Sequence, residues 1–282
     1  WNLERGVEVA ALLQARWPAH WAALAARLEL GAAELEAWRA IAAAMYTGFD
    51  PVTGLFEQFR GYFGLEPIDL AAYEPRTAPM DVLLGRERTQ RSQVIKQADV
   101  VMLLMLLWER FPAHVRAANF RYYEPRCGHG SSLSPPVHAV VAARLGHVTL
   151  AERYFRQAAA IDLDDTMGNA SGGVHIAALG GLWQAAVFGF AGLSLRADGL
   201  RLAPQLPATW EALRFRVQWR GRQVQCVIRQ EPPQLTAILE RGAPLRLYLG
   251  TQVQVLRRGQ PWTADWTAMA WRSTRDEHDG AA

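Results

Sequence analysis

The chain has 282 residues, of which 50% are hydrophobic and 20% charged, with a formal net charge of +3. A chain of this size and composition can form one large hydrophobic core or two smaller domains without stabilisation by disulfides or metal ions. A strongly apolar run at 100–108 is about half of the roughly 20 residues that a membrane helix needs, so no membrane partner is predicted.

Charge and cysteine usage exclude further classes of protein. The arginines are scattered along the chain, which argues against nucleic acid as a partner. Cys127 and Cys226 form no metal-spaced pair, which argues against a zinc site and a disulfide framework. A reducing, cytoplasmic setting fits this cysteine usage best.

The first third of the chain predicts helices followed by a long loop. Apolar residues recur at helical spacing over 6–44, with a break at Gly31 that indicates two or more helices. Residues 50–91 are rich in glycine, proline and aromatics and predict an ordered surface loop, a kind of connection that tends to carry function. Ser92 is predicted to cap a buried helix that runs to about residue 110.

The middle third predicts helical hairpins. Ser134-Pro135-Pro136 is typical of a helix start, and the predicted helix ends at Leu145 before Gly146. Residues 149–160 are its expected antiparallel partner. A glycine-rich turn at 168–173 leads into a predicted helix over 174–188.

Glycines and a change of period mark the end of the helical region. Gly180 and Gly181 lie inside the last predicted helix and indicate close packing against another backbone, because glycine in a helix costs about 1 kcal/mol. After Gly192 the apolar residues alternate with polar ones, which predicts a small β-sandwich. The polar stretch 273–282 predicts a disordered tail.

Lys96 is the only lysine in the chain, and every other non-histidine basic residue is arginine. The ammonium group of lysine is compact, whereas the guanidinium group of arginine is planar. A single retained lysine therefore indicates a site that needs an ammonium group. The alternative is an ordinary surface lysine. Lys96 and Gln97 fall in the first turn of the helix predicted from Ser92, and Asp99 on the same face would orient the lysine.

Three polar clusters precede predicted inner helices. They are Lys96-Gln97, His129-Gly130-Ser131-Ser132 and Gly172-Gly173 with His175. Helix N-termini present free N–H groups and a positive dipole end, so their convergence would make an anion site with phosphate as the obvious ligand. The alternatives are simple capping for the serines and a satisfied buried histidine for His175.

Glu124 lies among aromatics just before the His129 loop. A carboxylate there suits a general base or an acceptor for sugar hydroxyls. The alternative is an ordinary ion pair with Arg121 or Arg126.

Several spaced motifs together resemble glycoside hydrolase family 65, the family of maltose, trehalose and kojibiose phosphorylases and related α-glucosidases. The motifs are Ile95-Lys96-Gln97-Ala98-Asp99-Val100, Tyr123-Glu124, His129 with Ser131-Ser132-Leu133-Ser134, Gly168-Asn169, Gly173-Val174-His175-Ile176-Ala177, Gly180-Gly181-Leu182-Trp183, Gly189-Phe190-Ala191-Gly192-Leu193, Pro204-Gln205-Leu206-Pro207 and Trp210. They run in order over residues 46–230.

The resemblance implies a mainly α fold with a β-rich C-terminal domain: part of an (α/α)6 barrel over 1–190, a β-sandwich over 191–272, and the tail over 273–282. It implies inverting phosphorolysis of an α-glucosidic disaccharide to β-glucose 1-phosphate. By resemblance, Lys96 and Gln97 would contact the glucosyl unit, while Ser131, Ser132 and His175 would hold phosphate. Inorganic phosphate is then a co-substrate, and neither a cofactor nor a metal is expected. Relatives are often homodimers.

The chain departs from the family pattern in two respects. The general acid of the family lies upstream of a stretch resembling Trp1-Asn2-Leu3, so the chain is expected to be a C-terminal fragment that lacks this acid and is inactive alone. Phosphorylases usually carry His-Asp-Ser-Ser, whereas this chain has Gly130 at the second position. Two alternatives therefore remain, an inverting α-glucosidase with Glu124 as base and a non-catalytic sugar-binding module.

Overall fold

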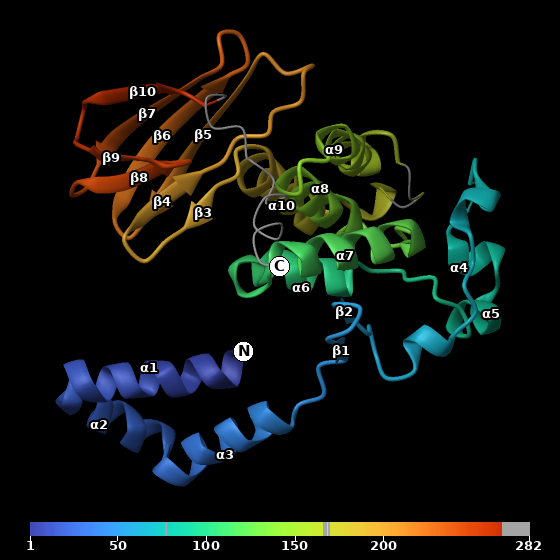
Figure 1. The fold of residues 1–282 in the computed structure, drawn as a ribbon, viewed down its shortest axis with the longest axis horizontal. Coiled ribbons are helices and arrows are strands. Elements are labelled where there is room, and N and C mark those ends of the chain that lie inside the picture. The colour runs from blue at the N-terminus through green and yellow to red at the C-terminus, as the bar shows by residue number, and fades with distance from the viewer. Residues whose placement is uncertain (77, 166–167, 169, 267–282) are drawn as a thin grey trace, which may run out of the picture. The chain divides into compact units, whose positions relative to one another are not determined.

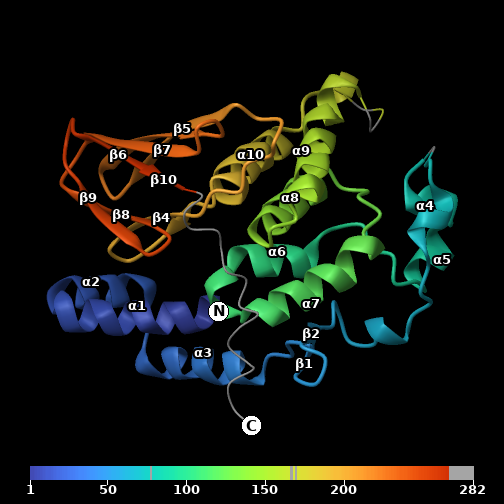
Figure 2. The same cartoon turned by 45° about the horizontal axis from the view of Figure 1, so that its top comes forward.

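The computed structural model describes residues 1–76, 78–165, 168 and 170–266. The chain divides into two compact units, Trp1–Phe49 and Asp50–Ala282. Figures 1 and 2 show helices throughout the first unit and, in the second, a helical region followed by strands. The tail predicted to be disordered, 273–282, lies outside the described residues.

The first unit consists of three helices. They are α1 (Asn2–Arg16), α2 (Pro18–Leu28) and α3 (Ala32–Ala44). Val7 and Ala10 of α1 form a small core with Leu35 of α3. Gly31 directly precedes α3, which confirms the break expected there. The helices predicted from apolar spacing are thus present.

The second unit begins with the long connection, which is built from short ordered elements. These are β1 (Phe49–Asp50, across the unit boundary), β2 (Leu55–Phe56), α4 (Met80–Leu83), α5 (Arg86–Gln90) and single 3₁₀ turns at Tyr62–Gly64 and Leu70–Tyr73. Fully buried Asn119 fixes its start. The amide of Asn119 accepts a hydrogen bond from Phe56 N at 2.8 Å and donates to Gly54 O at 2.7 Å.

The helical region of this unit surrounds one buried helix. Its helices are α6 (Asp99–Leu106), α7 (Ala113–Tyr123), α8 (Ser134–Arg144), α9 (Val148–Leu163) and α10 (Ile176–Gln184), which continues into a π-helical turn at Ala185–Phe190. Helix α8 is buried from Ser134 to Ala143 and packs against α6, α9 and α10 (Figure 2). Gly146, at φ +82°, follows its end, as predicted.

The two glycines of α10 behave differently. A Cβ on Gly181 would lie 2.6 Å from Cγ of Pro136, so this glycine allows α10 to approach α8 closely. A Cβ on Gly180 would meet no described atom within 4 Å. The expectation of close packing is confirmed for Gly181 and wrong for Gly180, because the two residues face different sides of the helix.

The helix predicted to start at Ser92 starts instead at Asp99, so Lys96 and Gln97 lie in the loop before it. The backbone of this loop pairs with distant segments. Ile95 N donates to Arg126 O at 2.9 Å, and Gly128 N donates to Ile95 O at 2.8 Å. These long-range bonds replace the local ones that a helix would have made, which a periodicity argument cannot detect.

The described residues from 194 to 265 form a β-sandwich of two four-stranded sheets, as predicted (Figure 1). The strands are β3 (Ser194–Leu195), β4 (Gly199–Leu202), β5 (Ala212–Trp219), β6 (Arg222–Arg229), β7 (Gln234–Arg241), β8 (Leu245–Leu249), β9 (Gln252–Leu256) and β10 (Pro261–Asp265). One sheet has the order β10-β7-β6-β5 and is antiparallel; the other has the order β3-β4-β8-β9, with β4 and β8 parallel. Alternate residues such as Val224, Cys226 and Ile228 are buried.

The fold class predicted from the sequence is therefore confirmed as mainly helical with a sheet-rich C-terminal region. Among the described residues, none of the helices combines the length and the apolarity that crossing a membrane requires.

Candidate functional site

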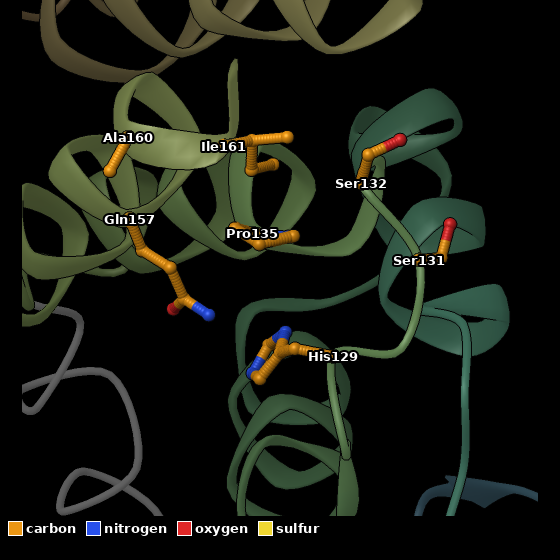
Figure 3. Close-up of a pocket in the computed structure, with 7 residues that line it drawn as sticks. All are labelled: His129, Ser131, Ser132, Pro135, Gln157, Ala160 and Ile161. Atoms are coloured by element: carbon orange, nitrogen blue, oxygen red, sulfur yellow. The ribbon is translucent and has the colours of Figure 1, made fainter. Parts of the chain in front are cut away.

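The loop in front of α8 forms one wall of a cavity of about 330 Å³. Figure 3 shows His129, Ser131 and Ser132 on this loop and Gln157 on α9. The cavity is lined by His129, Ser131, Ser132, Pro135, Gln157, Ala160 and Ile161. The two serines predicted to hold an anion thus share a cavity next to the N-terminus of α8. The backbone of this helix start offers the cavity little, because Pro135 and Pro136 have no N–H and Ser134 N donates to Ser131 O at 3.1 Å.

The side chain of Lys96 lies across this loop. A Cβ on Gly130 would be 3.1 Å from Lys96 Cγ, so the glycine leaves room for the methylene stem of the lysine. Lys96 and Gln97 are both exposed, and among the described residues no salt bridge to Lys96 is present. Asp99 accepts from Gln58 Nε2 at 3.1 Å, so this carboxylate is hydrogen-bonded to a glutamine of the long connection.

A second cation, Arg76, reaches the same loop. Its guanidinium donates to Gly128 O at 2.9 Å while pairing with Glu74 at 2.7 Å. Sequence reasoning missed Arg76, because it lies 52 positions away from Gly128 in a segment with no motif. Lys96 and the ion pair of Arg76 with Glu74 thus both lie at the loop that carries the serines.

His129 and His138 lie behind the serines, and their imidazoles are held in the neutral form. Burial, with a smaller contribution from the neighbouring His138, lowers the pKa of His129 to about 2. Burial also lowers the pKa of His138 to about 4. The His129 ring is hydrogen-bonded through Nδ1 to Ser134 Oγ at 3.0 Å. At neutral pH these rings therefore offer hydrogen bonds and lone pairs rather than positive charge.

His175, the third predicted anion ligand, is held by Asp162 at the end of α9. Its Nδ1 lies 2.6 Å from Asp162 Oδ1, and its backbone N donates to Oδ2 at 2.9 Å. The hydrogen bond from the His175 ring lowers the pKa of Asp162 below its ordinary value. His175 is not among the residues that line the cavity, whereas Ile161, the neighbour of Asp162, is. Sequence reasoning missed Asp162 because it lies 13 positions away in another helix.

Glu124 is engaged by residues of α9. Tyr154 donates its hydroxyl to Glu124 Oε1 at 2.6 Å, and Arg153 lies 3.5 Å from the same oxygen. Burial, followed by the bond to Glu124, raises the pKa of Tyr154 above its usual range. Glu124 is thus ion-paired, as the alternative interpretation held, but its partner is Arg153, while Arg126 donates to Gln93 Oε1 and Tyr122 O.

Gln93 connects the segments that carry these groups. Its Oε1 accepts from Tyr122 Oη and Arg126 Nε, each at 3.0 Å, and its Nε2 donates to Phe63 O at 3.1 Å. This buried amide therefore fixes the strand-like approach to Lys96 against the end of α7. No motif in the sequence points to Gln93.

The sequence was compared with protein-family models, and two models match, one over the helical region and one over the β-sandwich. Residues 1–184 match the family described as "Glycosyl hydrolase family 65 central catalytic domain", and residues 193–256 match "Glycosyl hydrolase family 65, C-terminal domain". The chain belongs to glycoside hydrolase family 65, which confirms the resemblance inferred from the motifs.

Its curated relatives include proteins named as phosphorylases. Kojibiose phosphorylase of Caldanaerobacter subterraneus subsp. tengcongensis is 35% identical over 82% of this chain and 30% of the relative. Alpha,alpha-trehalose phosphorylase of Geobacillus stearothermophilus is 33% identical over 88% and 32%, and maltose phosphorylase of Bacillus subtilis (strain 168) is 32% identical over 82% and 30%.

A solved structure from human microbiome, provisionally named a kojibiose phosphorylase, superposes with a TM-score of 0.76 at 26% identity over 85% of this chain and 32% of that one. The chain spans about a third of the length of the curated relatives it matches.

Proposed function

We propose that the protein is an inverting α-glucoside phosphorylase that cleaves a glucose-containing disaccharide with inorganic phosphate to give β-glucose 1-phosphate. The observation that carries the proposal is the cavity in front of α8, where Ser131 and Ser132 lie on a loop reached by Lys96 and Arg76. Hydroxyls and nearby cations are donors that a phosphate requires. The phosphorylase names of the relatives support the same reading.

The proposed roles follow from the chemistry of an inverting transfer. Ser131, Ser132 and His175 hold phosphate, and Lys96 and Gln97 contact the glucosyl unit. Phosphate attacks the anomeric carbon from the face opposite the leaving oxygen, which inverts the configuration. Phosphate is already an anion, so the site has to position it but needs no general base to activate it. A neutral His129 is compatible with a site that lacks a general base. No organic cofactor or metal takes part in this step.

The wider setting is also part of the proposal. The helical region is part of an (α/α)6 barrel, the sandwich is a separate domain over 191–272, and the whole protein forms a homodimer in the cytoplasm. Two free, buried cysteines, Cys127 and Cys226, are typical of a reducing compartment.

The test uses the complete gene product incubated with kojibiose, trehalose and maltose, each with and without phosphate. Phosphate-dependent formation of β-glucose 1-phosphate, with the anomer read by NMR, is expected for at least one sugar. Release of glucose that does not depend on phosphate would identify a hydrolase, in which case Glu124 is the base to mutate. Binding of sugar without turnover would identify a sugar-binding protein.

Matched serine variants test the phosphate assignment. Ser131→Ala and Ser132→Ala should each raise the KM for phosphate by about 10- to 100-fold, because a hydrogen bond to a charged group contributes about 1.5–3 kcal/mol. Ser194→Ala, in β3 of the sandwich, is the control and should leave this KM unchanged. Equal KM values for phosphate in all three variants would show that Ser131 and Ser132 do not bind phosphate.

A further inference from the structure

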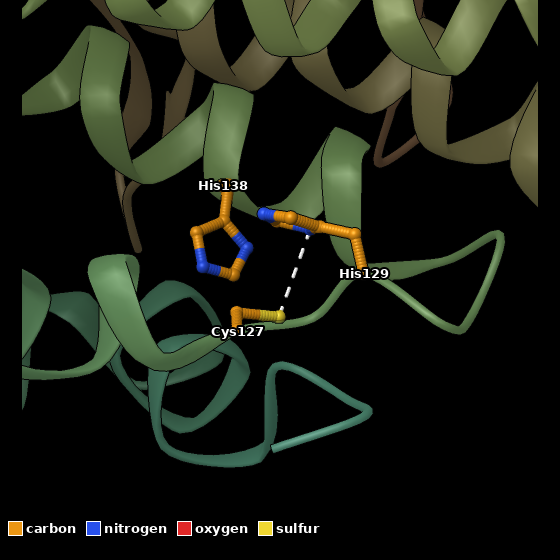
Figure 4. A group of neighbouring side chains, drawn as sticks. All are labelled: Cys127, His129 and His138. Carbon is orange, nitrogen blue, oxygen red and sulfur yellow. Dashed lines mark hydrogen bonds between the residues drawn. The ribbon is translucent and has the colours of Figure 1, made fainter. Parts of the chain in front are cut away.

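Three side chains with metal-ligating atoms meet behind the serine loop. Cys127 follows the turn after α7, His129 lies on the loop, and His138 lies on α8 (Figure 4). Cys127 Sγ is 3.6 Å from His129 Nδ1, and one donor atom from each of the three residues lies within 4.8 Å of the others. Cys127 is 2% exposed and His138 is fully buried.

The spacing of these donors is close to what a tetrahedral ion requires. Zinc binds thiolate at about 2.3 Å and imidazole at about 2.0–2.1 Å, which places neighbouring ligand atoms about 3.6 Å apart. The sulfur and Nδ1 of His129 already have that separation, at 3.6 Å. The largest separation in the group, at most 4.8 Å, is about 1 Å longer than a bound ion requires, so binding would draw the donors together by that amount.

Hydrogen bonding within the protein leaves one of these donors unused. His138 Nδ1 is bonded to the carbonyl of Ser134 at 2.9 Å, an arrangement that orients metal-ligating histidines. His138 Nε2 is buried and has no hydrogen-bond partner among the described residues. A buried nitrogen left without a partner costs about 1–3 kcal/mol, so it calls for an explanation.

We propose that Cys127, His129 and His138 bind a single zinc-class divalent cation. One thiolate and two neutral imidazoles are the donors that favour such an ion over magnesium or calcium. Three protein ligands leave a fourth position for water or an anion, and the cavity that His129 also lines gives the ion its route of entry. This site has no paired-cysteine signature in the sequence, because its second and third ligands are histidines. The proposal does not depend on the proposed phosphorylase activity.

The experiment titrates the purified 282-residue chain with Co²⁺ and with Zn²⁺. Co²⁺ at this site should give a thiolate-to-metal charge-transfer band in the near ultraviolet that saturates at one ion per chain, and Zn²⁺ should bleach it. Cys127→Ser should remove the band and weaken Zn²⁺ binding, measured against a chromophoric chelator, by about 100-fold or more. Cys226→Ser is the matched control, since the second cysteine is equally buried but lies in β6.

His129→Gln is a second, milder variant and should also weaken Zn²⁺ binding, with circular dichroism confirming that each variant is folded. Absence of a charge-transfer band in the unaltered chain would overturn the proposal. Zn²⁺ binding that survives both Cys127→Ser and His129→Gln would also overturn it, because the ion would then sit on other histidines of the chain.

Discussion

The two adjacent glycines of α10 offer a matched test of how closely this helix packs on α8. In Gly181→Ala the new Cβ would lie 2.6 Å from Pro136 Cγ, which is 0.8 Å short of the 3.4 Å at which ordinary contact begins. In Gly180→Ala the new Cβ meets no described atom within 4 Å. Both changes gain about 1 kcal/mol of helix propensity, so this gain cancels when the two variants are compared.

The difference between the variants is therefore the steric term. Overpacking of a buried contact costs about 1–3 kcal/mol, so Gly180→Ala should be more stable than Gly181→Ala by about that amount. Gly180→Ala alone should stabilise the chain by about 1 kcal/mol. Urea denaturation of the 282-residue chain, followed by circular dichroism, measures both free energies of unfolding.

The result also concerns the candidate site. Pro135 lines the cavity, and Pro136, the residue that Gly181 contacts, follows it directly in the chain. A Gly181→Ala chain that is as stable as Gly180→Ala would refute the close approach of α10 to α8. The position of the cavity wall would then need another explanation.

Three further predictions concern buried polar anchors. Asn119→Leu removes the side-chain partners of Phe56 N and Gly54 O and should lower the free energy of unfolding by about 2–6 kcal/mol in urea; a loss below about 1 kcal/mol would contradict the importance of these bonds. The carboxyl of Asp162 has a pKa below its ordinary 3.8, so its anchoring of His175 is fully present above pH 3.8 and is lost as the pH falls through the lower folded pKa. The His175 amide resonance should move in that acid range, and this acid transition should vanish in Asp162→Ala. Arg144→Met removes two hydrogen bonds to backbone carbonyls of the segment before β3 and should lower stability by about 1–3 kcal/mol in thermal melting; an unchanged melting curve would argue against those bonds.

The site could be predicted only in part. The serines of the loop and Lys96 were identifiable because an unusual residue type or a helix-start signal marks them locally. Gln93, Arg76 and Asp162 carry no such mark, since each acts through a hydrogen bond to a residue 13 or more positions away. Glu124 was recognised as a candidate, but its partner Tyr154 lies 30 positions further on.

The sequence by itself determined the helices with local start and stop signals, such as α8 between its prolines and Gly146, and the alternating strands of the sandwich. Its ordered motifs were also sufficient to place the chain in glycoside hydrolase family 65. These properties depend on neighbours within one or two turns, or on residue identity alone.

Only the tertiary structure decided that residues 92–98 are not helical, because Ile95 exchanges backbone hydrogen bonds with Arg126 and Gly128, which are distant in sequence. The same pairing lays Lys96 across Gly130, and the burial of α8 brings His138 to Cys127. Long-range pairing and burial act between residues that no sequence window contains together, so the site emerges only when the chain is folded.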